Sequence, residues 1–397
     1  MKDIDLRRIR QAALRLSHSG EGERNKFLAA LSRELVRDEK KILAANTLDV
    51  KNAKAKGVSA AFLERLTLGE KGIELLVKKV ASIAKLKSGL GEIIERKKKA
   101  DGLVLTKVRV PLGVLMVIYE ARPEVTIDVA ALCVKSGNAA ILKGGSEALA
   151  TNAALYACVH RALKKSGLPE DAIAFVATAD RHATDALLKR HDAIDLVVAR
   201  GSYGMVKAVM EVTKIPVLAH AAGGARIYVD KSADLGMAEK ILINAKITKP
   251  SACNSLDTIL VHRAIAKKFV PRIASALSSR GVAIMKNPDW DEETLGMTVG
   301  IKVVKDVAEA VAFVHDHSKR HSEGIIAKDA RVIKKFTEEV DAAAIFVNAS
   351  TRLHDGYVFG LGSEMGISTG KLHARGPVGL KELTTYKWEI YGTGNIR

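Results

Sequence analysis

Aromatic residues are scarce in this chain. Phe, Trp and Tyr supply 4% of its 397 residues, although hydrophobic residues as a whole supply 48%. The core must therefore consist mainly of Ala, Val, Leu and Ile, which suits parallel sheets covered by helices better than an aromatic-rich β-sandwich. The length is sufficient for two or three domains.

Cysteine is scarce as well, and its positions do not suggest disulfides. The three cysteines, Cys133, Cys158 and Cys253, include no CxxC pair, and an odd number is a poor disulfide framework. No apolar stretch is long enough to span a membrane, and the N-terminal residues lack the apolar segment of a signal peptide. We therefore expect a cytoplasmic protein without a membrane partner.

Acidic residues are outnumbered by basic ones. There are 45 Asp and Glu against 63 Lys and Arg, which gives a formal net charge of +18. This surplus favours an anionic partner, such as a phosphorylated cofactor, an acidic substrate or nucleic acid, but an ordinary charged surface fits it equally well. The basic run at residues 95–99 has no aromatic residues among its cations, so we do not expect nucleic-acid binding there.

The order of local patterns predicts an α/β protein. Residues 1–92 show the apolar spacing of amphipathic helices, and strand, turn and helix patterns alternate after residue 103. Such alternation indicates parallel sheets with right-handed crossovers. We predict two α/β domains that divide near residue 225, with a hairpin at 93–111. The predicted strands are 114–119, 139–143, 172–176 and 194–198, then 225–230, 258–262, 324–327 and 344–347.

Cys253 is the first candidate for chemistry. It follows the loop-like stretch Lys249-Pro250-Ser251-Ala252 and precedes Asn254, which predicts a loop-to-helix junction. The N–H groups and dipole of a helix there would lower the pKa of the thiol and hold an oxyanion. A buried, inert cysteine fits the local sequence equally well. Cys133 and Cys158 lie in apolar helical patterns and are interpreted as core residues.

Two glycine-rich turns are the second candidate. Lys143-Gly144-Gly145-Ser146-Glu147 and Arg200-Gly201-Ser202-Tyr203-Gly204 each follow a predicted strand and open a helix. This arrangement offers backbone N–H groups to a phosphate, although neither turn is a GxGxxG or Walker motif. Together, with a cation at each entrance, they favour a dinucleotide site over plain turns. The cations also favour NADPH through its 2′-phosphate.

The sequence predicts no metal site. His315, His317 and His321 are closely spaced, but Lys319 and Arg320 lie beside them, and two cations disfavour a bound dication. We interpret these histidines as part of a solvated face.

Short motifs along the chain carry a family resemblance. They include Val110-Pro111-Leu112-Gly113-Val114, Ile118-Tyr119-Glu120-Ala121-Arg122-Pro123, Ser136-Gly137-Asn138-Ala139, Val347-Asn348-Ala349-Ser350-Thr351-Arg352 and Leu372-His373-Ala374-Arg375-Gly376-Pro377. Through them the chain resembles the gamma-glutamyl phosphate reductases, a branch of the aldehyde dehydrogenase superfamily, nearly from end to end.

The resemblance implies a role for particular residues. Cys253, followed by Asn254, occupies the position of the catalytic nucleophile. The substrate-binding candidates are Arg122, Asn348, Arg352 and Arg375, where the arginines would clamp a carboxylate or phosphate or else form structural ion pairs. The cofactor-binding candidates are Lys143, Gly144, Ser146 and Glu147 for the adenosine ribose and its phosphate, Arg200, Gly201 and Ser202 near the pyrophosphate, and Glu364 for the nicotinamide ribose.

The same resemblance implies the architecture. It predicts two Rossmann-like three-layer α/β/α domains and a small oligomerisation hairpin. The cofactor-binding domain would comprise residues 1–92 and 112–225, and the catalytic domain 226–372. Segments 93–111 and 383–397 would join copies of the chain into a dimer or tetramer.

The implied activity is reduction of L-glutamyl 5-phosphate by NADPH to L-glutamate 5-semialdehyde in proline biosynthesis, through a Cys253 thioester. Glutamate 5-kinase, which makes this unstable acyl phosphate, is a candidate partner. Four residues depart from the family pattern, namely Glu124, Ala222, Arg226 and Asp257. They leave open a different acyl phosphate as substrate, and a CoA-acylating aldehyde dehydrogenase is a further alternative.

Overall fold

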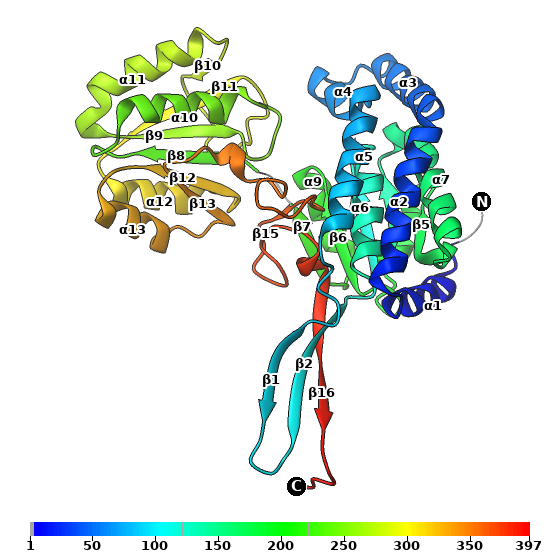
Figure 1. Cartoon of the computed structure of the whole chain (residues 1–397). Helices are drawn as coiled ribbons and strands as arrows, with labels where there is room; N and C mark the ends of the chain where they lie inside the picture. The colour runs from blue at the N-terminus through cyan, green and yellow to red at the C-terminus, as the bar shows by residue number, and fades with distance from the viewer. Residues whose placement is uncertain (1–3, 121, 221–222) are drawn as a thin grey trace. The chain divides into compact units, whose positions relative to one another are not determined.

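The chain folds into two compact units in a computed structural model, which describes residues 4–120, 122–220 and 223–397 (Figure 1). Unit 1 consists of Met1–His220, Gly360–Gly366 and Val378–Arg397, and unit 2 of Ala221–Phe359 and Ile367–Pro377. Both units contain a parallel sheet with helices, which confirms the predicted α/β class. Residues 360–366 pack with unit 1, although the sequence assigned them to the range 226–372. The functions given to the two domains stay predictions.

Unit 1 begins with helices, as the apolar spacing predicts. Asp5 caps the first of them by accepting hydrogen bonds from two backbone N–H groups of its first turn. Leu28, Leu31 and Leu35 are fully buried on one face of the second helix, which packs against the fifth helix and against α7 (Leu149–Ser166). The five helices are α1 (Leu6–Ser17), α2 (Glu21–Arg37), α3 (Glu39–Ala55), α4 (Ala60–Leu66) and α5 (Glu70–Lys85).

A five-stranded parallel sheet in the order β5-β4-β3-β6-β7 forms the centre of unit 1. Every residue of β3 is buried, as a central strand covered on both faces requires. The strand order reverses between β3 and β6, and parallel sheets bind ligands at the carboxyl ends of the strands beside such a reversal. The strands are β3 (Val114–Tyr119), β4 (Ala139–Gly144), β5 (Ile173–Phe175), β6 (Leu196–Arg200) and β7 (Val217–His220), and the helices between them are α6 (Val125–Lys135), α7, α8 (Arg181–Leu188) and α9 (Tyr203–Val212). Of these strands, only β7 lies outside the predicted set.

The predicted hairpin is present and gains a third strand. β1 (Ile93–Lys98) and β2 (Val104–Pro111) pair antiparallel, and β16 (Thr384–Tyr391) pairs with β2 on its other side. In Figure 1 this narrow sheet extends away from the helices of unit 1. The side-chain amide of Asn138 is fully buried and joins the chain segments at the base of the narrow sheet. It accepts from the N–H of Gly113 and donates to the carbonyl oxygen of Leu383.

Unit 2 contains a six-stranded parallel sheet in the order β10-β11-β9-β8-β12-β13. An apolar cluster lies on each face, one packed with α10 and α11 and the other with α12 and α13. The strands are β8 (Ala225–Val229), β9 (Leu256–His262), β10 (Ala283–Met285), β11 (Thr298–Val304), β12 (Ser322–Ile326) and β13 (Ala344–Val347), and the helices are α10 (Leu235–Ile247), α11 (Arg263–Ser278), α12 (Val307–His317) and α13 (Ala330–Glu339). β8, β9, β12 and β13 confirm predicted strands, whereas β10 and β11 were not predicted.

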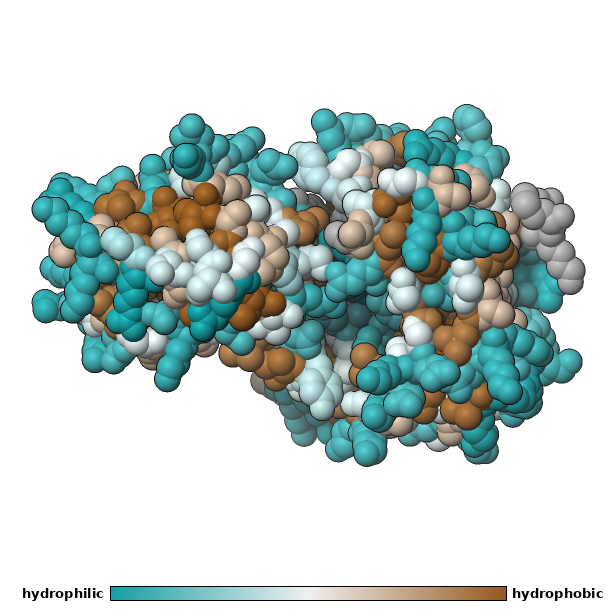
Figure 2. All heavy atoms as spheres, turned by 90° about the horizontal axis from the view of Figure 1, so that it is seen from above, coloured by the Kyte–Doolittle hydropathy of each residue, from teal (hydrophilic) through white to brown (hydrophobic). Residues whose placement is uncertain are grey.

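Short elements complete both units. They are the 3₁₀ turns η1 (Ser146–Ala148), η2 (Glu170–Ala172), η3 (Thr351–Leu353) and η4 (Lys381–Leu383), with the strand pair β14 (Ile367–Ser368) and β15 (Gly376–Pro377). Figure 2 shows hydrophobic areas separated by hydrophilic ones on the visible face of each unit. Among the described residues, no helix is both long and apolar enough to span a membrane.

Candidate active site

Cys253 lies in a turn between α10 and β9 in unit 2, so the predicted loop-to-helix junction is wrong. The residues that follow it form a fully buried strand, paired on both sides, instead of a helix. No helix dipole therefore acts on its thiol from the following residues. Cys253 is partly exposed, whereas Cys133 and Cys158 are buried. Burial raises the pKa of the Cys133 and Cys158 thiols, which is consistent with their interpretation as core residues.

Two glycines allow a second backbone segment to reach this turn. The N–H of Gly224 donates to the carbonyl oxygen of Cys253 at 2.6 Å. A Cβ atom at Gly223 would lie 2.3–2.7 Å from three atoms of Cys253, so only glycine fits there. Gly224 has φ +104°, and a Cβ atom on it would lie 2.3 Å from Oδ2 of Asp257. The sequence showed these glycines only as a break near residue 225, and Ala222 lies outside the described residues.

Asn254, the residue after Cys253, is hydrogen-bonded to a further segment of the chain, the one that contains η3. Thr351 Oγ1 donates to the carbonyl oxygen of Asn254 at 2.9 Å, and Asn254 Nδ2 donates to the carbonyl oxygen of His354 at 2.9 Å. Asn254 and Thr351 are buried. The side-chain amide of Asn254 thus forms part of the support of the turn, directly beside the candidate nucleophile.

Arg352 lies in the same segment. Its guanidinium is half-buried, and burial lowers its pKa while the charge of Cys253 raises it. Arg352 and Cys253 therefore interact electrostatically. The structure therefore brings together three residues predicted from the sequence, Cys253, Asn254 and Arg352.

Two other predicted substrate residues have structural contacts. Asn348 follows β13 at the carboxyl edge of the sheet, whereas Cys253 precedes β9 at the amino edge. The amide of Asn348 accepts from the N–H and donates to the carbonyl oxygen of Ala327. Arg375 forms an ion pair with Asp341 at 2.5 Å. Of the two interpretations of Arg375, a substrate clamp or a structural ion pair, the structure thus shows a structural ion pair.

Ionisable side chains occupy the interior of unit 2. Arg226 and Glu323, exposed by 2% and 0%, lie 3.5 Å apart. Burial raises the pKa of Glu323 to about 7, although the charge of Arg226 and the hydrogen bond from Ser318 lower it. Burial likewise raises the pKa of Asp257 to about 6 and lowers the pKa of Lys246 to about 8. Two departures from the family pattern, Arg226 and Asp257, therefore belong to a set of buried charges.

The histidines interpreted as a solvated face divide into two groups. His315 Nε2 contacts the carbonyl oxygen of Glu339, and His317 Nδ1 contacts Asp291 at the surface. His321 is completely buried, so the interpretation is wrong for this residue. His321 directly precedes β12, and every residue of that strand is buried. Within the described part of the chain, no group of three His, Cys, Asp or Glu side chains could hold a metal ion.

The predicted cofactor residues of unit 1 meet at one edge of its sheet. Tyr119 at the end of β3 pairs with Gly144 of β4 on one side and with Arg200 of β6 on the other. A Cβ atom at Gly144 would lie 2.2 Å from Asn152 Nδ2 and 3.0 Å from the Tyr119 ring, so the turn after β4 requires glycine. The two predicted turns therefore lie beside the reversal of strand order, where parallel sheets bind ligands.

The N-terminus of α9 already holds an oxyanion. Glu120 accepts hydrogen bonds from the N–H of Ser202 at 2.8 Å and from Ser202 Oγ at 3.0 Å. Ser202 is the N-cap of α9. A carboxylate at this position shows that the donors suit an anion such as a phosphate. Glu120 belongs to one of the family motifs, which do not mark it as a site residue, and its position one residue after a buried strand is the signal that could have identified it.

Other cofactor candidates have local partners in unit 1. Lys143 Nζ donates to the carbonyl oxygen of Gly144 at 2.8 Å, and burial lowers the pKa of Lys143 while Glu147 raises it. Arg200 donates to the carbonyl oxygen of Met365 at 3.1 Å. Arg200 thereby fixes the segment that carries Glu364. Ser146 is exposed in η1, and Arg122 is half-buried between β3 and α6.

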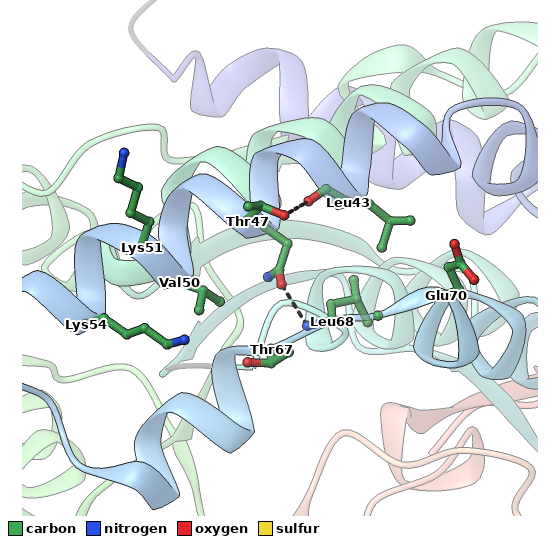
Figure 3. Close-up of a pocket in the computed structure, with 10 residues that line it drawn as sticks. Leu43, Thr47, Val50, Lys51, Lys54, Thr67, Leu68 and Glu70 are labelled. Carbon is green, nitrogen blue, oxygen red and sulfur yellow. Dashed lines mark hydrogen bonds between the residues drawn. The ribbon is translucent and has the colours of Figure 1, made fainter.

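A separate pocket of about 580 Å³ lies between α3 and the start of α5 (Figure 3). Asn46 Oδ1 accepts from the N–H of Leu68 on one side of it, and Lys51 and Lys54 extend from α3. None of the site residues predicted from the sequence lines this pocket.

Comparisons with known proteins agree with one another. The aldehyde dehydrogenase family model matches residues 10–290 of this chain. The gamma-glutamyl phosphate reductase of Carboxydothermus hydrogenoformans is 43% identical over 406 residues, which covers 98% of each chain. The crystal structure of gamma-glutamyl phosphate reductase from Thermotoga maritima has a TM-score of 0.95 and 39% identity, covering 99% of this chain and 98% of its own. An acetylating aldehyde dehydrogenase from Geobacillus thermoglucosidasius, at 18% identity with coverage of 99% and 96% and a TM-score of 0.74, shares the fold.

The first prediction concerns the glycine beside Cys253. Gly223→Ala places a methyl group against Cys253, so it should lower the free energy of unfolding by about 1–3 kcal/mol. It should also change the rate at which iodoacetamide alkylates Cys253, measured by mass spectrometry of the intact protein. Gly296→Ala is the matched control in unit 2, because its methyl group would meet nothing within 4 Å. Equal behaviour of the two variants would contradict a close packing of Gly223 on Cys253.

The second prediction concerns how the free energy of unfolding depends on pH through Glu323. Because burial raises the pKa of Glu323 from 4.5 to about 7, the folded state binds more protons than the unfolded state in this window. Stability from this group is complete below pH 4.5 and decreases as the pH rises toward 7. Glu323→Gln lacks this decrease, so the stability of the variant relative to wild type should grow by on the order of 1–3 kcal/mol between pH 4 and pH 8. Parallel stability curves in urea would show that Glu323 has an ordinary pKa.

Proposed function

The chain belongs to the aldehyde dehydrogenase family, and from this we propose that it reduces L-glutamyl 5-phosphate to L-glutamate 5-semialdehyde in proline biosynthesis. The observation that carries the proposal is a partly exposed Cys253 that interacts electrostatically with Arg352, in a chain whose relatives bear the name of this activity. A thiol supported in this way can take up an acyl group from an acyl phosphate.

The first step transfers the acyl group to the enzyme. The thiolate of Cys253 attacks the acyl carbon, the carbon–oxygen bond to phosphate breaks, and inorganic phosphate leaves with the electron pair. Arg352 attracts the thiolate before the attack and is placed to attract the anionic substrate. The N–H donors of the turn that holds Cys253 are candidates for stabilising the oxyanion.

The second step reduces the thioester. A bound nicotinamide cofactor would supply a hydride, and a thioester accepts a hydride more readily than a carboxylate does. Collapse of the hemithioacetal then restores the Cys253 thiolate and releases the aldehyde. Covalent catalysis thus divides one difficult reaction into two easier ones.

The cofactor in this proposal is NADPH. Ser202 and the first turn of α9 would hold its pyrophosphate, since the backbone N–H and the hydroxyl of Ser202 already donate to the carboxylate of Glu120. Lys143 is the cation proposed for the 2′-phosphate, with Gly144, Ser146 and Glu147 in the same turn. Arg200 supports the segment of Glu364, which is proposed for the nicotinamide ribose, and Gly201 completes the turn before α9.

Alternative acyl substrates differ in the leaving group. A CoA-acylating enzyme shares the thioester and the fold, but the relatives at 41–43% identity are named for an acyl phosphate. A different acyl phosphate is the alternative that the departures at Glu124, Ala222 and Arg226 keep open. Arg122 and Arg352 are the proposed substrate contacts, and the Asn348 and Arg375 side chains have structural partners.

A second copy of this chain is the proposed partner of the narrow sheet. Tyr386, Trp388 and Ile390 alternate along β16 and are 50%, 43% and 59% exposed. Lys107 Nζ lies 3.7 Å from the centre of the Tyr386 ring and covers only part of this apolar face. Self-association through β1, β2 and β16 would bury it. A kinase that supplies the acyl phosphate remains a further proposed partner.

The function is tested in the reverse direction. Purified protein is given pyrroline-5-carboxylate, phosphate and NADP⁺, and the absorbance of reduced cofactor is followed. Turnover should require phosphate and should decrease at least about a thousandfold in Cys253→Ala. Cys158→Ala is the matched control, because it removes a buried thiol from unit 1. Turnover that requires CoA in place of phosphate, or that survives Cys253→Ala, would overturn the proposal.

Glu120 generates a separate prediction for cofactor binding. Because its carboxylate occupies the donors proposed for the pyrophosphate, Glu120→Gln should remove a like-charge repulsion and tighten NADPH binding by roughly threefold to tenfold. The measurement is a titration of NADPH fluorescence. Glu211→Gln makes the same charge change at the other end of α9 and should leave the affinity unchanged. Weaker binding by Glu120→Gln would mean that Glu120 supports the cofactor.

A further inference from the structure

Two buried histidines share one serine hydroxyl beneath the Cys253 turn. Ser322 Oγ lies 2.8 Å from His321 Nδ1 and 2.8 Å from His354 Nδ1. All three side chains are 0% exposed. The rings of His321 and His354 lie 5.1 Å apart, and Phe346 and Phe359 pack against His354. The mechanism proposed above uses none of these residues.

The chemistry of the hydroxyl limits the protonation of the two rings. A serine hydroxyl has one O–H donor and two acceptor lone pairs, so it can donate to at most one Nδ1. At least one of the two histidines must therefore carry a proton on Nδ1 and donate it to Ser322. The bridge fixes both imidazole rings, because either ring loses a buried hydrogen bond if it turns.

The bridge is joined to the Cys253 turn along two routes. The first runs through His354, whose carbonyl oxygen accepts from Asn254 Nδ2 at 2.9 Å. The second runs through the sheet, since Ser322 pairs with Ala225 at the start of β8. The preceding residue, Gly224, donates to the carbonyl oxygen of Cys253. Ser322 is thus connected to both contacts that support the turn, to Asn254 through His354 and to Gly224 through β8.

We propose that Ser322 and His354 are positioning residues for the Cys253 nucleophile. The Ser322 hydroxyl fixes His354, His354 fixes Asn254, and Asn254 fixes the turn that presents the thiol. The inference rests on the proposed function only in assigning catalysis to Cys253. Neither residue touches the reacting atoms, so their loss should affect kcat and thiol reactivity more than the binding of either substrate.

The test compares three variants of the full chain. Ser322→Ala removes the bridging hydroxyl and should lower both kcat and the iodoacetamide rate of Cys253 by roughly tenfold, with KM for the acyl substrate and the affinity for NADPH within about twofold of wild type. Ser322→Thr keeps the hydroxyl and should restore most of both rates. His354→Ala should reproduce the loss from the other end of the bridge, and it serves as the second probe if Ser322→Ala does not fold.

Tyr228→Phe is the matched control. It removes one buried hydroxyl from the neighbouring strand β8, where Tyr228 Oη donates to Asp230 at 2.9 Å, away from the contacts of Asn254. It should lower thermal stability to a similar degree while leaving the alkylation rate unchanged. Equal loss of thiol reactivity in Tyr228→Phe and Ser322→Ala would overturn the proposal, as would unchanged reactivity in both Ser322→Ala and His354→Ala.

The alkylation rate separates this inference from the proposed function. If wild-type protein reduces no acyl phosphate but Ser322→Ala still slows alkylation and Ser322→Thr restores it, the function is wrong and the positioning role stands. If turnover is found and alkylation is insensitive to Ser322, the function stands and the positioning role is wrong.

Discussion

The contact between Gly224 and Cys253 is the constraint on which the candidate site depends. Its hydrogen bond joins the residue before β8 to the turn before β9, so the turn of the candidate nucleophile is attached to two neighbouring strands of the sheet. A side chain at Gly223 would prevent this approach. Both strands are buried and paired on both sides, so the sheet fixes the position of the turn that carries the thiol. Side chains from other segments then supply charge and hydrogen bonds around the turn.

Charge at this site comes from side chains instead of a helix. Arg352 is held near Cys253 because Thr351 and His354 on either side of it are bonded to Asn254. Four ionisable side chains are buried in unit 2, namely Lys246, Asp257, Arg226 and Glu323. Burial lowers the pKa of Lys246 and raises the pKa values of Asp257 and Glu323. Such groups stabilise a fold only while their partners remain in place, so they link the stability of unit 2 to pH more closely than surface ion pairs do.

In unit 1 the backbone N–H and hydroxyl of Ser202 hold a carboxylate of the same chain. The carboxyl ends of β3, β4 and β6 lie in register, and the reversal of strand order opens a place beside β3. Glu120 fills the donors of α9 there. An acidic side chain at this position satisfies donors at the N-terminus of the helix, and it would repel an anionic ligand that approached the same donors.

The sequence by itself determined the elements with strong local patterns. The buried strands β3 and β9, the N-terminal helices and the hairpin at β1 and β2 follow from apolar spacing, and the motifs led to Cys253 and to the turns at Gly144 and Ser202. Local pattern failed where tertiary pairing decides the outcome: the residues after Cys253 lead into the strand β9, which pairs with β8 and β11, instead of into a helix. Only the tertiary structure decided that Glu120 contacts Ser202, that the charges of Arg352 and Cys253 interact and that Ser322 joins two histidines. These contacts join residues far apart in the chain, and a hydrogen bond or an ion pair leaves no periodic trace in sequence from which its partner could be identified.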